Sequence, residues 1–196
     1  MSIAFAWIAR EVSTKWIRKL AEILTVEKFQ RLPEDSGGGY HELRGGKVVT
    51  IARPAFRHRS LRRQLRRLLE RAGSPLIAID SEVAFRPLPE HELRVADVAV
   101  VTAEREAAID PNGHLMGAPD LAIEVLSPSN TFSEINDKET LCLENGAREF
   151  WVVDPFRRLV KLAKPDGHTV TYRPGQSIPW LFAPETAAIA VDRIFS

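Results

Sequence analysis

Two acidic residues interrupt apolar stretches in the middle of the chain. Asp97 lies within residues 95–101, and Glu124 lies within residues 121–126. Both stretches are rich in β-branched residues and are bounded by polar loops, which predicts short buried strands. An ionised carboxylate in a buried strand costs on the order of several kcal/mol unless a partner compensates it. A hard divalent cation held by both carboxylates would be such a partner, so the two residues suggest a metal-dependent active site.

The two carboxylates are 27 positions apart, which allows two adjacent strands with a loop between them. If the strands pair, both side chains can approach one cation. Glu124 shares strand parity with Asp120, for which we expect a turn or capping role because it precedes the strand. The alternative is that each carboxylate lies at a strand end, exposed to water or paired with an arginine. Residue types alone leave both interpretations open.

A lysine follows the second stretch at a distance that a helix could bridge. Pro128 ends the strand after Glu124, because proline cannot donate a ladder hydrogen bond. Residues 133–144 then predict a helix that ends at Asn145-Gly146, with Lys138 about one turn inside it. A lysine there could reach back to the strand end, orient an attacking water and offset charge on a phosphate. Without further context, an isolated helical lysine is usually a surface charge.

The clearest helix covers residues 57–72. His58 shares one face with apolar residues at helical spacing, and Gly73 marks the end. His58 could therefore be a hydrogen-bonded structural histidine. We place the arginines of this helix on the opposite surface, where they would contact phosphates or simply face water: Arg59, Arg62, Arg63, Arg66, Arg67 and Arg71.

The remaining pattern indicates a mixed α/β (α+β) domain around one sheet. Thr25 is the expected N-cap of a short helix, and Gly45-Gly46 joins a predicted hairpin from residue 40 to residue 52. Strands are expected at residues 76–79, 81–86, 94–101, 121–126, 148–153, 159–163 and 168–172, and residues 102–120 as a loop. Asp154, before Pro155, is expected to form a turn.

Length and composition bound the possible functions. The 196 residues suit one domain, which we place at residues 25–196, preceded by a helical extension over residues 1–24. A net charge of +1 predicts no global attraction to nucleic acid, so such binding needs a local basic patch. The single cysteine, Cys142, excludes an internal disulfide and fits a cytoplasmic location. We expect neither a signal peptide nor a membrane span.

From Tyr40 to about Asp154 the sequence closely resembles the Uma-two family of restriction-type endonucleases, within the PD-(D/E)XK nuclease superfamily. The resemblance rests on short motifs with matching spacing: Tyr40-His41-Glu42-Leu43, the helix-start His58, Arg94-Val95-Ala96-Asp97-Val98, the run from Gly117 to Ser129, Lys138, and the run from Gly146 to Pro155.

The resemblance implies a restriction-endonuclease-like mixed central sheet flanked by helices. It also implies that Asp97 and Glu124, helped by the backbone carbonyl of Val125, hold Mg²⁺ or alternatively Mn²⁺. The superfamily's usual lysine, two residues after the glutamate, would fall at Leu126, and the family pattern supplies Lys138 from the following helix instead. Glu42 and His58 match family positions that border the site.

The resulting hypothesis is a Mg²⁺-dependent endonuclease that cleaves phosphodiester bonds in DNA. Asp97, Glu124 and Lys138 are its expected catalytic residues, and analogy with other sheet-based nucleases of this size suggests a homodimer. A non-catalytic nucleic-acid-binding or interaction domain that keeps the nuclease fold is the main alternative. A metal-assisted hydrolase of small phosphoesters is a third interpretation.

Overall fold

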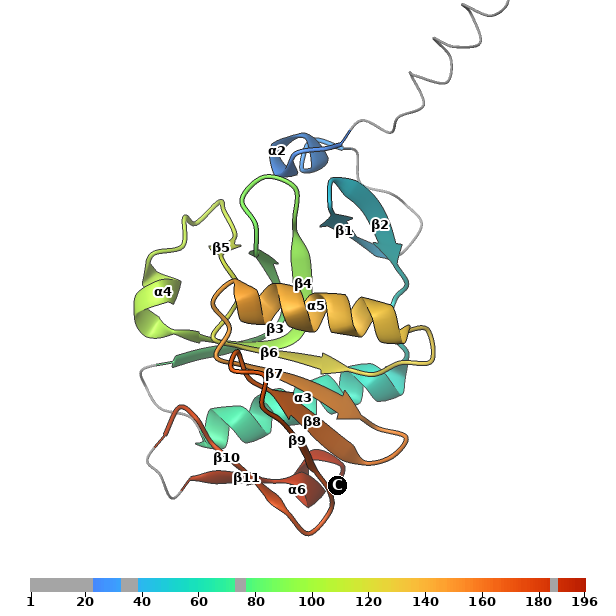
Figure 1. Ribbon diagram of the computed structural model, residues 1–196, viewed down its shortest axis with the longest axis vertical. Helices are drawn as coiled ribbons and strands as arrows, with labels where there is room; N and C mark the ends of the chain where they lie inside the picture. Colours follow the sequence, from blue (N-terminus) through green and yellow to red (C-terminus); the bar gives the residue numbers. More distant parts are fainter. Residues whose placement is uncertain (1–22, 33–38, 73–76, 184–186) are drawn as a thin grey trace, which may run out of the picture.

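A seven-stranded mixed sheet forms the centre of the molecule (Figure 1). The computed structural model describes residues 23–32, 39–72, 77–183 and 187–196. The sheet has the strand order β5-β3-β4-β6-β7-β8-β9, in which β6–β7 and β3–β5 are parallel pairs and the other neighbours are antiparallel. The predicted class, a mixed α/β fold around one sheet, is confirmed.

The strands of this sheet are β3 (Ile77–Arg86), β4 (Arg94–Thr102), β5 (Leu115–Met116), β6 (Leu121–Val125), β7 (Glu149–Asp154), β8 (Leu159–Ala163) and β9 (Thr169–Tyr172). Two hairpins lie outside it: β1 (Tyr40–Arg44) with β2 (Lys47–Ile51), and β10 (Ser177–Pro179) with β11 (Ala188–Ala190). The helices are α2 (Val26–Phe29), α3 (Phe56–Ala72), α4 (Ala103–Ala107), α5 (Phe132–Glu144) and α6 (Val191–Ile194).

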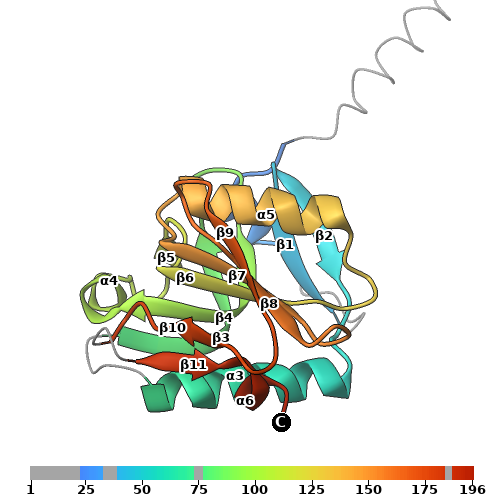
Figure 2. The ribbon, with the colours of Figure 1, turned by 60° about the horizontal axis from the view of Figure 1, so that its bottom comes forward.

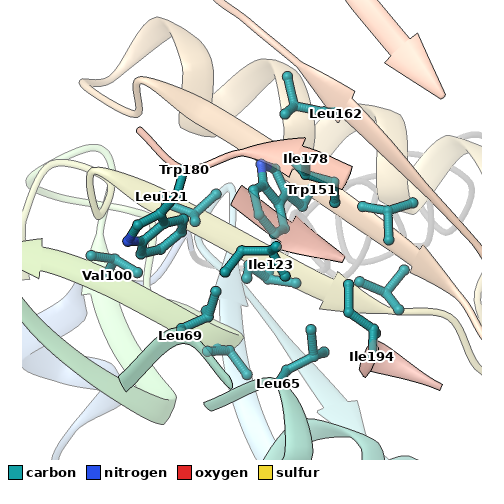
Figure 3. Close-up of a cluster of buried hydrophobic side chains, with 14 of the residues drawn as sticks. Leu65, Leu69, Val100, Leu121, Ile123, Trp151, Leu162, Ile178, Trp180 and Ile194 are labelled. Carbon is teal, nitrogen blue, oxygen red and sulfur yellow. The ribbon is translucent and has the colours of Figure 1, made fainter. Parts of the chain in front are cut away.

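Helices α3 and α5 cover opposite faces of the sheet, as Figure 2 shows. On the α3 side, Leu65 and Leu69 pack with Ile123 and Trp151 in one buried cluster, to which Trp180 adds an edge-on contact 6.1 Å from Trp151 (Figure 3). On the α5 side, a second cluster includes Ala99, Ala122, Phe150, Val152 and Cys142. Strands β4, β6 and β7 are therefore buried on both faces, which explains their nearly continuous apolar sequences.

Several predictions for the elements hold. Thr25 Oγ1 accepts a hydrogen bond from the Lys28 backbone at 3.3 Å and caps α2. The turn between β1 and β2 uses Gly45 and Gly46 at φ +54° and +73°, which glycine tolerates without a Cβ clash. The predicted extension over residues 1–24 lies outside the described residues except for residues 23 and 24.

Other expectations were wrong. The two strands expected at residues 76–79 and 81–86 are one strand, β3, whose register with β4 is the same on both sides of Glu82 (Ser81–Val98 and Val83–Ala96), although Glu82 has φ +58°. The stretch 102–120 holds the expected loop around residues 111–113, and it also contains the short elements α4 and β5, which were not expected. Within the described part of the chain, no helix combines the length and the apolar character that crossing a membrane requires.

Candidate active site

Asp97 and Glu124 meet because β4 and β6 are neighbours in the sheet. These antiparallel strands place Val98 opposite Ile123, so one further step of the same register places Asp97 opposite Glu124 on the same face. The Asp97 backbone N–H donates to Glu124 Oε1 at 3.4 Å, and the Val125 N–H donates to Asp97 Oδ2 at 2.8 Å. Each residue is only 8% exposed. The structure thus joins the two acids in one buried pair.

Lys138 reaches this pair from α5. The helix begins with a capping box in which Thr131 and Glu134 bond each other's backbone N–H groups, and this fixes the start of the helix after β6. Lys138 lies in the second turn and is buried. Its Nζ is 2.7 Å from Glu124 Oε1 and donates to the Val95 carbonyl at 2.6 Å. The lysine that the sequence placed near the strand end therefore contacts the glutamate directly.

Glu42 lies behind the lysine rather than on the surface. It is 1% exposed, and its Oε1 accepts from the Val95 N–H at 3.0 Å and lies 3.7 Å from Lys138 Nζ. Its Oε2 accepts from Arg44 Nε at 2.8 Å. Glu42 is therefore a second carboxylate beside the lysine, in addition to Glu124.

His58 and Arg62 project from the first turns of α3 toward Asp97. His58 Nε2 is 2.8 Å from the Val125 carbonyl oxygen and 3.2 Å from Asp97 Oδ2. Arg62 Nη1 is 3.3 Å from Asp97 Oδ1 and 3.0 Å from Oε1 of Glu82, a β3 residue with φ +58°. Asp97 therefore has a basic partner on each carboxylate oxygen.

The sequence prediction placed Arg62 on the exposed face of its helix, and this was wrong, since the residue is 5% exposed. The helical spacing contained the signal. Position 62 follows His58 by four residues and precedes Leu65 by three, so it belongs to the inward face.

The acids and the lysine strongly influence one another's ionisation. Burial raises the pKa of Glu124 to about 7, because the nearby Asp97 and Glu42 carboxylates add to the desolvation and the Lys138 ammonium only partly offsets it. Burial alone would lower the pKa of Lys138, but the Glu124 and Glu42 carboxylates raise it overall. The pKa of Asp97 is lowered although burial opposes this, because His58 and the Val125 N–H stabilise its carboxylate. At neutral pH, Glu124 is thus the acid that exchanges its proton most readily.

Asp120 and Asp154, the other two acids for which the sequence suggested a role, lie outside this cluster. Asp120 accepts hydrogen bonds from the Thr102 N–H and from Arg105, each at 3.0 Å, and fixes the start of α4. Asp154 Oδ1 accepts from the backbone N–H groups of Phe156 and Arg157, which is the turn role expected for it. Neither contributes to the cluster around Glu124.

The cluster opens to the surface through a hollow of about 300 Å³. Its walls come from the start of α3, the β1–β2 hairpin and the loop between β6 and α5. Its lining residues include Tyr40, Arg53, Ser127, Ser129 and Asn130, with Asp97 and Glu124 at the inner end. A polar ligand can therefore approach both carboxylates from outside.

The donor atoms suit a hard cation. No group of three or more His, Cys, Asp or Glu in the described ranges is arranged to hold a metal ion, so a ligand set must include other oxygens. The Val125 carbonyl supplies one, because it and Asp97 Oδ2 already converge on a single atom, His58 Nε2. Two carboxylates and a carbonyl are the oxygen donors that Mg²⁺ prefers, so the donor set fits such an ion, and His58 Nε2 lies where two of these oxygens converge.

Comparison with known proteins agrees with this architecture. The structure is similar to the crystal structure of a protein from Anabaena variabilis ATCC 29413 described as a "putative nuclease belonging to DUF820". The TM-score is 0.74 and the identity 23%, covering 88% of this chain and 97% of the other. This similarity establishes a fold shared with a protein of the nuclease class.

The family model of Uma2, described as "Putative restriction endonuclease", matches residues 26–190. The chain therefore belongs to the Uma2 family, as the resemblance in its motifs predicted. No curated protein matches the chain.

Proposed function

We propose that this protein is a Mg²⁺-dependent endonuclease that hydrolyses phosphodiester bonds in DNA. One observation carries the proposal: two buried carboxylates from neighbouring strands line an open hollow, and a buried lysine from α5 contacts one of them, Glu124. Membership in a family of restriction-endonuclease type supports hydrolytic nuclease chemistry.

In this proposal Asp97, Glu124 and the Val125 carbonyl would hold the cation. A bound Mg²⁺ would supply Lewis-acid polarisation of the scissile phosphate and a more acidic attacking water. Lys138 would orient that water and stabilise negative charge that develops on the phosphate. Glu42 holds the Lys138 ammonium in place through a contact of 3.7 Å, and burial keeps competing water away from it. Little covalent work is then left to the protein, as in other phosphoryl transfers.

A plasmid assay tests the proposal. Purified protein is incubated with supercoiled DNA in Mg²⁺, Mn²⁺ or a chelator, and the variants Asp97→Asn, Glu124→Gln and Lys138→Met are compared with wild type. Asp137→Asn serves as the matched control, because Asp137 is an exposed acid next to Lys138 on the same helix. We expect nicking that requires the metal, persists in the control and is lost in the three site variants. Circular dichroism of each variant separates lost chemistry from lost folding.

A second candidate is a nucleic-acid-binding domain without catalysis. It is favoured by the contacts of the acids, because Asp97 already pairs with His58 and Arg62, and Glu124 with Lys138. Such pairing would leave no free charge for a cation. Calorimetric titration with Mg²⁺ distinguishes the two candidates: DNA binding without metal binding or cleavage would favour this domain and refute the nuclease.

A further inference from the structure

The face of α3 that points away from the sheet carries a row of arginines. Arg63, Arg67 and Arg71 follow one another at four-residue spacing, and all three are exposed. Within the described residues, none of the three forms an ion pair, although the Arg63 guanidinium lies 5.9 Å from the Phe56 ring. In contrast, the neighbouring Arg66 pairs with two acids, Glu70 and Asp80. The row therefore presents uncompensated positive charge to the solvent.

Helix α6 turns this row into a groove. It lies beside α3 (Figure 2), where Gln64 Nε2 donates to the carbonyl oxygens of Arg193 and Ser196, each at 2.7 Å. The hollow between the helices measures about 450 Å³. It is lined by Ser60, Arg63, Gln64, Arg67, Leu68, Arg71, Arg193 and Ser196, and no Asp or Glu side chain is among these described residues.

This charge distribution is unfavourable for the isolated chain. Like charges four residues apart on a helix destabilise it by about 0.2–0.5 kcal/mol for each pair. The helix dipole offsets this only for Arg71, which lies in the last turn. The whole chain has a net charge of only +1, so the groove is a local concentration of positive charge. A polyanion that lies along the groove would remove the repulsion.

We infer that this arginine groove binds the phosphate backbone of DNA and extends substrate contact along α3 beyond the active site. The inference rests on the proposed DNA substrate. Helix α3 connects the two sites: Arg62 contacts Asp97 from its inward face, and Arg63, Arg67 and Arg71 line the groove on its outer face. From Arg63 to Arg71 the helix rises about 12 Å, which matches three to four nucleotides of one strand. Guanidinium groups hold phosphate oxygens in paired hydrogen bonds, which suits arginine better than lysine for this task.

The test measures DNA binding without cleavage. Fluorescence anisotropy follows a labelled 20-base-pair duplex in a chelator across a series of salt concentrations. The groove variant carries Arg63→Gln, Arg67→Gln and Arg71→Gln. The control variant loses the same charge at exposed positions elsewhere, through the substitutions Arg31→Gln, Lys47→Gln and Arg173→Gln.

Each phosphate contact contributes about 0.9 to the slope of log K against log salt concentration. We therefore expect the slope of the groove variant to be shallower by about 2.7 and its affinity to fall by on the order of a hundredfold at 0.1 M salt. The control variant should keep the wild-type slope.

The outcomes separate this inference from the proposed function. Equal slopes for the groove and control variants would overturn the groove while leaving plasmid cleavage unaffected. A second outcome combines a shallower slope for the groove variant with a wild type that cleaves no plasmid, whether or not metal is present. It would support the groove and refute the nuclease. Two further results would overturn the groove. One is a wild type that binds no duplex, and the other is a groove variant that binds the duplex like wild type but no longer binds anionic lipid vesicles.

Discussion

The proposed Mg²⁺ site should bind its ion more weakly as the pH falls through 7, because Glu124 would first have to lose a proton. Its pKa is raised to about 7 in the folded chain, so below pH 7 the carboxyl holds a proton that must leave before a cation can bind. Asp97 adds nothing in this range, because its pKa is lowered and it is already ionised. The pKa of His58 is raised by Asp97, although burial opposes this. Protonated His58 would also weaken Mg²⁺ binding at low pH, because its Nε2 lies against the Val125 carbonyl oxygen and Asp97 Oδ2, two of the proposed ligands.

The magnitude follows from the ionised fraction of Glu124. For a pKa of about 7, the fraction of ionised carboxylate is about 0.9 at pH 8 and about 0.1 at pH 6. The apparent Mg²⁺ affinity should therefore fall about tenfold between these pH values, which corresponds to about 1.4 kcal/mol. The His58→Gln variant isolates this contribution by removing the second titrating group.

Isothermal titration calorimetry in two buffers of different ionisation enthalpy measures both the affinity and the protons released. In the His58→Gln variant we expect about one proton released per Mg²⁺ at pH 6 and about a tenth at pH 8. An affinity that stays constant from pH 6 to pH 8, with no proton release, would refute the claim that Glu124 must ionise to bind metal.

Three substitutions test other parts of the structure. Lys138→Met should destabilise the fold by about 3–5 kcal/mol at pH 8, because Glu42 and Glu124 lose their shared cation; an unchanged urea midpoint would show that the ammonium is not needed there. Leu65→Ala should cost about 2–5 kcal/mol in urea unfolding, since the side chain is fully buried, and a cost below about 1 kcal/mol would contradict its place in the core. Thr131→Ala should cost about 1 kcal/mol by removing the α5 cap, and Thr131→Ser should restore most of it.

The elements that carry the site were predictable because their signals are local. The strand that contains Glu124 was predictable from its own apolar residues. The helix that contains Lys138 was predictable from the residues that begin and end it. The pairing of β4 with β6 came from the structure, because the spacing of Asp97 and Glu124 allowed adjacent strands but did not require them. The short elements α4, β5 and α6 were missed because each has two to five residues and forms through tertiary contacts rather than through its own periodicity.

The site residues that escaped prediction depend on long-range geometry. Arg62 was placed on the exposed face of its helix because arginine is charged, although its position in the helix points inward. Its second partner, Glu82, has a positive φ inside β3, at the point where the sequence pattern predicted a break between two strands. The burial of Glu42 likewise depends on how the β1–β2 hairpin docks on the sheet, which no local pattern encodes.

The basic groups around the acids bear on whether this chain needs a bound ion in order to fold. Lys138, Arg62 and His58 arrive from two different helices and each already neutralises an acid. Many small metalloproteins unfold when a chelator strips their ion, because their ligands then repel one another. Here basic side chains of the chain itself lie against the buried acids, so we expect the fold to keep its stability in a chelator.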